Sequence, residues 1–104
     1  MSQVPGEESV RLQAVVRGRV QGVGFRDYVQ TRAGNLRLTG FVRNLADGRS
    51  VEVVAEGTRA SLGILLAQLR NGPRGAQVDA VEAEWSAATG EYSGFGATYR
   101  GTFR

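Results

Sequence analysis

The sequence predicts an α+β fold, a two-layer sandwich in which an antiparallel sheet of four to five strands carries two helices on one face. Two kinds of pattern support this prediction. Several short segments alternate between apolar and polar residues, as half-buried strands do, and two longer segments show the apolar spacing of helices. Their order along the 104-residue chain is strand, helix, strand, strand, helix, strand. A chain of this length is expected to form one domain around one core.

The first half of the chain contains three strands and one helix. Residues 10–17 alternate and form the first strand, and residues 39–45 and 50–57 form two more, joined through Asp47-Gly48, a strong signal for a hairpin turn. Between the first two strands, a glycine-rich loop leads into a helix that begins at about Phe25. Six residues have the spacing of one helical face, and Arg32 is the one polar intruder among them: Phe25, Tyr28, Val29, Arg32, Ala33 and Leu36.

The second half adds a helix and two strands. Thr58 is placed to cap a helix with a stripe of four leucines (Leu62, Leu65, Leu66 and Leu69), which ends at the sequence Asn-Gly-Pro at 71–73. Residues 76–85 read as a strand whose apolar phase slips after Ala80, which a β-bulge explains. A last short strand is expected at 96–100. We assign residues 1–8 to a flexible N-terminal tail and 9–104 to the single domain.

This order of elements is that of the split βαβ, or ferredoxin-like, sandwich. Right-handed crossovers leave a slot between the first two strands, and the third strand fills it. The first two strands then run in the same direction, so the loop after Arg17 and the end of the second strand near Asn44 reach the same edge of the sheet. They are two strand spacings apart, roughly 10 Å, a distance that a loop and a side chain can bridge.

Composition removes several classes of function. The chain has no cysteine and no histidine, which excludes disulfides, thiolate chemistry, imidazole bases and the usual zinc sites. Its N-terminus lacks the features of a secretion signal, and its longest apolar stretch is far too short to cross a bilayer. We therefore expect a cytoplasmic protein without a membrane partner.

All thirteen basic residues are arginine, and the net charge is +3. Residues 1–52 hold eight arginines against five acids, whereas residues 53–104 hold five of each, so the excess lies in the half that contains the glycine-rich loop. This asymmetry favours an anionic ligand at that end of the molecule. Since no two basic residues are adjacent, most of the arginines are better interpreted as solvated surface residues.

The stretch GRVQGVGFR at 18–26 is the strongest candidate for a site. It fails as a dinucleotide fingerprint because position 27 is Asp27, and as a phosphate-binding Walker loop because the chain has no lysine. Two interpretations remain, a tight strand-to-helix turn and an anion cradle made of successive N–H groups of residues 21–26. Arg26 favours the cradle, because a cation in the first turn of a helix is unfavourable unless a bound anion neutralises it.

Asn44 also has two interpretations. Its side chain could form an Asx turn that leads into the hairpin, the more common role for this spacing. As a neutral donor and acceptor, it could instead hold a water molecule near an anion. Asp27 and Asp47 flank the same region, but a carboxylate repels phosphate, so we interpret them as helix-start and turn residues.

The segments GRVQGVGFR at 18–26, GFVRNLADGRSVEVVAEG at 40–57 and GPRGAQVDAVEAEW at 72–85 together resemble the acylphosphatase family, over nearly all of residues 10–100. The resemblance implies a metal-independent hydrolase of carboxyl-phosphate bonds, without a cofactor, on a ferredoxin-like fold. It implies that Arg26 and Asn44 are catalytic, with Asn44 orienting the attacking water. The implied phosphate-binding residues are Gln21, Gly22, Val23, Gly24, Phe25 and Arg26. We expect a monomer that acts on a small-molecule acyl phosphate and does not bind nucleic acid.

Two positions depart from the family pattern. Arg37 stands at the exit of the first helix, where the family usually has glycine, and a non-glycine residue in a left-handed cap costs about 1 kcal/mol unless Asn35 shifts the cap. The chain also continues for five residues past Tyr99, which leaves open any role of the terminal carboxylate.

Two other functions share this order of elements. An RNA-binding module should carry aromatic residues on its central strands for base stacking, and the segment SVEVVAEG at 50–57 has none. A small-molecule regulatory domain would be expected to work attached to another domain, whereas this chain has the length of one.

Overall fold

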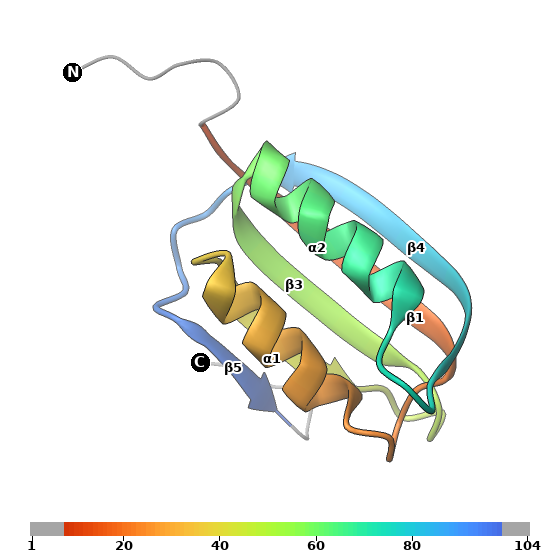
Figure 1. Cartoon of the computed structure of the whole chain (residues 1–104). Helices are drawn as coiled ribbons and strands as arrows, with labels where there is room; N and C mark the ends of the chain where they lie inside the picture. Colours follow the sequence, from red (N-terminus) through yellow and green to blue (C-terminus); the bar gives the residue numbers. More distant parts are fainter. Residues whose placement is uncertain (1–7, 99–104) are drawn as a thin grey trace.

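Two helices lie side by side across one face of a twisted sheet in the computed structural model, which describes residues 8–98 (Figure 1). The order of elements is as the sequence predicts, including the short strand at the end. The elements are β1 (Ser9–Arg19), α1 (Phe25–Asn35), β2 (Thr39–Asn44), β3 (Val51–Thr58), α2 (Arg59–Asn71), β4 (Gln77–Ala87) and β5 (Phe95–Thr98). None of the helices in this part of the chain is long and apolar enough to span a membrane.

The sheet has the strand order β4-β1-β3-β2-β5, so β3 lies between β1 and β2, as the split βαβ topology requires. Strand β3 is antiparallel to both neighbours, and β1 and β2 therefore run in the same direction. The prediction of an antiparallel sheet is wrong at one edge, where β5 pairs in parallel with β2. The connection after β4 crosses from one edge of the sheet to the other, so β5 returns in the direction of β2 and the sheet is mixed.

The core lies between the helices and the inner face of the sheet. Phe25, Val29 and Ala33 of α1 are buried there, and α2 buries its complete leucine stripe: Leu62, Leu65, Leu66 and Leu69. They pack against a buried cluster from the inner faces of β1, β2 and β3: Leu12, Ala14, Val16, Val42, Val51, Val53 and Ala55. Burying these side chains is the main favourable contribution to folding. It also holds the start of α1 and the ends of β1 and β2 at one end of the molecule.

The apolar phase slip predicted in the fourth strand is a β-bulge. Arg17 pairs with Ala80 and Gly18 pairs with Val78, so Asp79 is the extra residue on β4. At Gly18 the backbones approach so closely that a Cβ atom would lie 2.1 Å from the carbonyl oxygen of Gln77. Gly18 therefore belongs to the sheet, and only the later glycines of the 18–26 stretch belong to the loop.

The exit of α1 is a Schellman motif with an arginine in the position that favours glycine. The N–H of Leu38 donates to the carbonyl of Ala33 at 2.9 Å, and the N–H of Arg37 donates to that of Gly34 at 3.0 Å. Arg37 has a φ of 58°, in the left-handed region. Asn35 does not shift the cap, so the strain expected at Arg37 is present in the fold.

Three sequence predictions fall wholly or partly on the ends of the chain, outside the described residues. Residues 1–7 of the predicted N-terminal tail lie outside the described residues, as does Tyr99. The predicted last strand at 96–100 corresponds to β5, and the final two positions of the prediction also lie outside the described residues.

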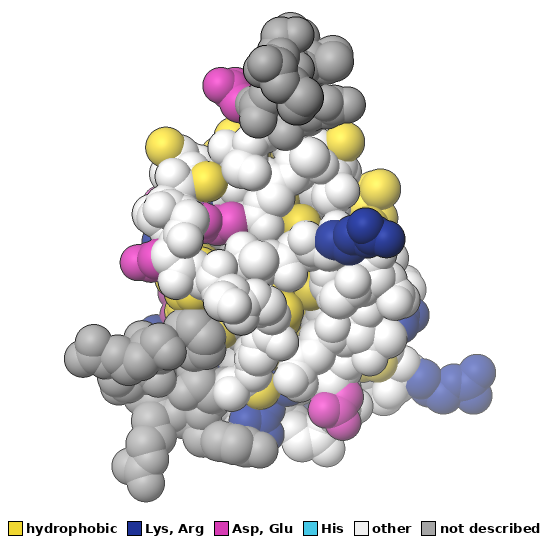
Figure 2. Space-filling model, turned by 90° about the vertical axis from the view of Figure 1, so that its left-hand side faces the viewer, with side chains coloured by type: hydrophobic (Ala, Val, Ile, Leu, Met, Phe, Trp, Pro, Cys, Tyr) yellow, Lys and Arg dark blue, Asp and Glu magenta, His cyan; other side chains and the backbone are white. Residues whose placement is uncertain are grey.

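On the side of the molecule where β5 lies, basic and acidic side chains are scattered, and the described residues form no continuous basic patch (Figure 2).

Candidate functional site

The loop between β1 and α1 is bent by two glycines and tied to the β2–β3 hairpin. Gly22 and Gly24 both have φ of 78°, which a glycine adopts without strain. The N–H groups of Val20 and Gln21 each donate to the carbonyl of Arg49 at 3.1 Å. The side-chain amide of Gln21 donates two further bonds of 2.8 Å, to the carbonyls of Leu45 and Ser50. Gln21 therefore holds the loop in place, and its N–H is directed to the hairpin.

The two helices begin differently. At the start of α2, Thr58 accepts a hydrogen bond from the N–H of Ser61 at 3.1 Å, as predicted. At the start of α1 the capping position is Gly24, which has no side chain to accept such a bond. Residues 21–24 form a turn, and within residues 8–98 the N–H groups of residues 22–25 donate neither to a side chain nor to the hairpin. The positive end of α1 thus presents uncapped donors, the arrangement that binds anions.

Three of these four residues, Gly22, Gly24 and Phe25, line a pocket of about 150 Å³. Its lining within the described chain comes from the loop, from α1 and from the ends of β2 and β5: Val20, Gly22, Gly24, Phe25, Arg26, Asp27, Gln30, Asn44 and Ala97. Arg26 and Asn44, selected from sequence as the two catalytic candidates, meet at this pocket. Of the other predicted phosphate-binding residues, Gly22, Gly24 and Phe25 line it, whereas Gln21 and Val23 do not.

Sequence reasoning did not select three of the lining residues, Val20, Gln30 and Ala97. Gln30 lies four residues after Arg26 on α1, so the helical period places it on the same face and could have identified it. Ala97 reaches the pocket only because β5 pairs in parallel with β2, at the register Val42–Ala97. No local pattern in the sequence indicates that pairing.

The side chain of Asn44 does not form the Asx turn that its spacing allows. Asp47 does so instead, with its Oδ1 accepting from the N–H groups of Arg49 and Ser50, both at 2.8 Å. The N–H of Ser50, followed by that of Arg49, lowers the pKa of Asp47 to about 2. The Oδ1 atom of Asn44 is buried and accepts no hydrogen bond from the described residues. A buried polar atom without a partner is rare and points to a function.

The charges at the pocket are few. Arg26 contributes a guanidinium, and Asp27, an exposed residue, is the one carboxylate among the described lining residues. Asp47, the other acid that flanks this region in sequence, is used in the hairpin turn and is absent from the lining. The described part of the chain contains no cluster of three or more His, Cys, Asp or Glu residues that could hold a metal ion.

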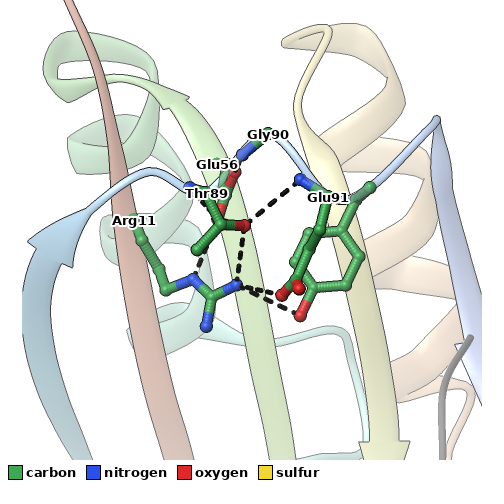
Figure 3. A network of polar contacts seen from close by, with 6 residues as sticks. Arg11, Glu56, Thr89, Gly90 and Glu91 are labelled. Atoms are coloured by element: carbon green, nitrogen blue, oxygen red, sulfur yellow. Dashed lines mark hydrogen bonds and ion pairs between the residues drawn. The ribbon is translucent and has the colours of Figure 1, made fainter.

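A polar network on the outer face of the sheet fixes the connection that leads to β5 (Figure 3). Glu56 on β3 is 4% exposed, and it accepts from the N–H groups of Thr89 and Gly90 at 3.0 and 2.9 Å. Arg11 on β1 donates to Glu56 at 2.9 Å and to Glu91 at 2.6 Å. Burial alone would raise the pKa of Glu56, but these donors lower it from 4.5 to about 2. The network thus fixes the connection between β4 and β5, and β5 places Ala97 at the pocket.

Comparison with known proteins agrees with this geometry. The family model for Acylphosphatase matches residues 12–97, which include the loop, both helices and the end of β2. The chain belongs to the acylphosphatase family. An acylphosphatase of Acidothermus cellulolyticus is 58% identical over 91 residues, which cover 85% of this chain and 86% of that protein. As an acylphosphatase, the chain is an enzyme of the hydrolase type.

Solved acylphosphatases share the fold. The structure of an acylphosphatase from Coxiella burnetii superimposes with a TM-score of 0.81 at 38% identity, covering 91% of this chain and all of that one. The acylphosphatase from Bacillus subtilis gives a TM-score of 0.82 at 34% identity, covering 86% of this chain and 99% of the other. The predicted α+β ferredoxin-like sandwich and the resemblance to the family are therefore both confirmed.

Proposed function

We propose that this acylphosphatase hydrolyses small-molecule acyl phosphates to a carboxylate and inorganic phosphate, without a metal ion or cofactor. The observation that carries the proposal is the meeting of Arg26, Asn44 and the uncapped start of α1 at one pocket. None of these features alone would define the reaction. Together they provide a cation, a set of N–H donors and a neutral polar group around a space that can hold a phosphoryl group.

The phosphoryl group would bind to the N–H groups of residues 22–25 and to the guanidinium of Arg26. An arginine fork can make two parallel hydrogen bonds to phosphate oxygens. These bonds neutralise part of the charge of the phosphoryl group and set its orientation. In phosphoryl transfer the charge of the transition state is spread over the equatorial oxygens, so fixed donors around those oxygens supply most of the catalysis.

Asn44 would orient the attacking water. Its buried Oδ1 has no partner within residues 8–98 and can accept one O–H of the water, which directs a lone pair of the water oxygen at phosphorus. The P–O bond to the acyl group breaks as the new P–O bond forms, and a phosphate oxygen takes the proton of the water. The departing carboxylate is a weak base and needs no acid, so a site without histidine or cysteine suffices.

The donor set of the pocket supports metal independence. Divalent cations such as Mg²⁺ and Ca²⁺ are held by several oxygen ligands, including carboxylates, and Asp27 is the one carboxylate among the described lining residues. We further propose that the enzyme works as a cytoplasmic monomer and has no nucleic-acid partner. The central strands β1 and β3 carry no aromatic side chain for base stacking, and the basic residues in Figure 2 are dispersed.

The test is the release of carboxylate from benzoyl phosphate, a synthetic aryl acyl phosphate, by the purified protein in EDTA. We expect full turnover in EDTA and competitive inhibition by inorganic phosphate, because the pocket recognises the phosphoryl group. Loss of turnover in EDTA that Mg²⁺ restores would contradict the proposed site. A steep loss of binding with salt, together with RNA affinity at near-physiological ionic strength, would support the RNA-binding alternative.

A further inference from the structure

Gln30 is a pocket residue to which the proposed chemistry gives no role. It lies in the middle of α1, it lines the pocket, and its side chain is half-buried. Within the described part of the chain its amide forms no hydrogen bond. No contact within residues 8–98 therefore explains why a polar residue stands at this position. Residues four apart on a helix have Cβ atoms about 6 Å apart, which places Gln30 one turn beyond Arg26 on the same face.

The acyl part of the substrate offers a hydrogen-bond acceptor. An acyl phosphate differs from other phosphate compounds by a carbonyl oxygen beside the phosphoryl group, and this oxygen can only accept hydrogen bonds. Among the described side chains of the lining, Val20, Phe25 and Ala97 are apolar, and Asp27 is an acceptor when ionised. With Arg26 assigned to the phosphate and Asn44 to the water, the amide of Gln30 is the donor that remains.

The layers of the fold place this donor on a suitable side. In an in-line displacement the water and the departing carboxylate lie on opposite sides of phosphorus. Asn44 ends β2 and so belongs to the sheet, whereas Gln30 belongs to the helix layer that covers it. A water held from the sheet would direct the departing acyl group towards the helix layer.

We infer that the side-chain amide of Gln30 donates a hydrogen bond to the carbonyl oxygen of the acyl group and makes the enzyme selective for acyl phosphates. This inference rests on the proposed function. As the P–O bond breaks, negative charge spreads onto the departing carboxylate, so the bond strengthens in the transition state and acts on kcat as well as on KM. Inorganic phosphate has no acyl group, and its binding is independent of Gln30.

The experiment replaces Gln30 by methionine, which keeps the length of the side chain and removes the donor. We expect kcat/KM to fall about fivefold for benzoyl phosphate and by the same factor for acetyl phosphate, since one neutral hydrogen bond is lost and both substrates carry the same carbonyl. The inhibition constant of inorganic phosphate should stay at its wild-type value. Thr31→Ala, an exposed change on the same helix that is absent from the lining, is the control and should change none of these constants.

Three outcomes would overturn the inference. An unchanged kcat/KM in a folded Gln30→Met protein would show that Gln30 does not contact the acyl group. A loss confined to benzoyl phosphate would mean that position 30 contacts the aromatic ring. A parallel loss of phosphate binding would mean that Gln30 supports the start of α1. In all three the wild type still turns over the substrate, whereas a wild type without turnover would refute the proposed function itself.

Discussion

The side-chain amide of Gln21 donates a hydrogen bond of 2.8 Å to the backbone carbonyl of Ser50. This bond ties the glycine loop before α1 directly to the hairpin that follows Asn44, and a second bond from the same amide reaches Leu45. The two sequence segments that supply Arg26 and Asn44 are thus held at a fixed separation by a residue that itself lies off the lining of the pocket.

Gln21→Ala should therefore affect stability and phosphate binding together. Two hydrogen bonds to backbone carbonyls are lost, and we expect the free energy of unfolding to fall by about 1–2 kcal/mol. Because the loop is less well fixed, the inhibition constant of inorganic phosphate should rise about fivefold. Gln77→Ala, at an exposed site on β4, is the matched control and should alter neither quantity. Normal phosphate binding in Gln21→Ala would show that the loop keeps its shape without the tether.

The Glu56 network predicts a loss of stability in acid. The pKa of Glu56 is lowered to about 2 in the fold, from 4.5 in its absence, so its contribution is complete above about pH 4.5 and is lost as the pH falls towards 2. At about 1.4 kcal/mol per pKa unit, this contribution is roughly 3–4 kcal/mol. Chemical unfolding measured from pH 6 to pH 2.5 should show the decline.

Glu56→Gln should flatten that decline and lower stability at pH 7. Glu84→Gln, which removes an exposed carboxylate on β4, should leave the pH dependence as it is in the wild type. If Glu56→Gln retains the full acid dependence, other carboxylates are responsible and the network does not have the assigned effect.

Arg37→Gly should stabilise the protein by about 0.5–1 kcal/mol. The left-handed backbone at Arg37 strains a residue with a Cβ atom but not a glycine, and the greater freedom of glycine in the unfolded chain offsets part of the gain. Arg70→Gly, which removes the same charge from the last turn of α2, should instead destabilise by about 1 kcal/mol. Thermal or chemical unfolding of both variants tests the difference in sign.

Much of the fold could be predicted from local patterns. The cap at Thr58, the start of α1 at Phe25 and the bulge in β4 each leave a short signature in the sequence, and the structure confirms them. The direction of β5 could not be predicted, because the sequence of a four-residue strand does not indicate which strand it pairs with or in which direction. Its pairing depends on distant contacts, such as the hydrogen bond from the N–H of Gly40 to the carbonyl of Gly94.

The position of the candidate site was also partly predictable. The glycines, the position of Arg26 and the topology were enough to bring the loop and Asn44 to one edge of the sheet. The environment of the individual side chains was not predictable, because it depends on tertiary contacts. The alternation of β3 places Glu56 on a face expected to be solvated, yet the connection between β4 and β5 buries it.

Arg26 should be needed for both binding and turnover. Arg26→Ala removes the guanidinium from the pocket, so phosphate should bind more weakly and kcat should fall. Arg26→Lys should recover little of either, because an ammonium group cannot reproduce two parallel hydrogen bonds. Phosphate inhibition and steady-state rates on benzoyl phosphate measure the two effects. Near wild-type rates in Arg26→Lys would show that charge alone is sufficient.

If Asn44 orients the attacking water at a phosphate site formed by other groups, Asn44→Ala should separate kcat from phosphate affinity. Binding of inorganic phosphate should remain near its wild-type value, while kcat falls by at least about 100-fold, a rise of roughly 2.7 kcal/mol in the barrier. Circular dichroism must first show that the variant is folded. A folded Asn44→Ala protein that keeps the wild-type kcat, or that loses phosphate binding as severely as Arg26→Ala, would show that Asn44 does not orient the water.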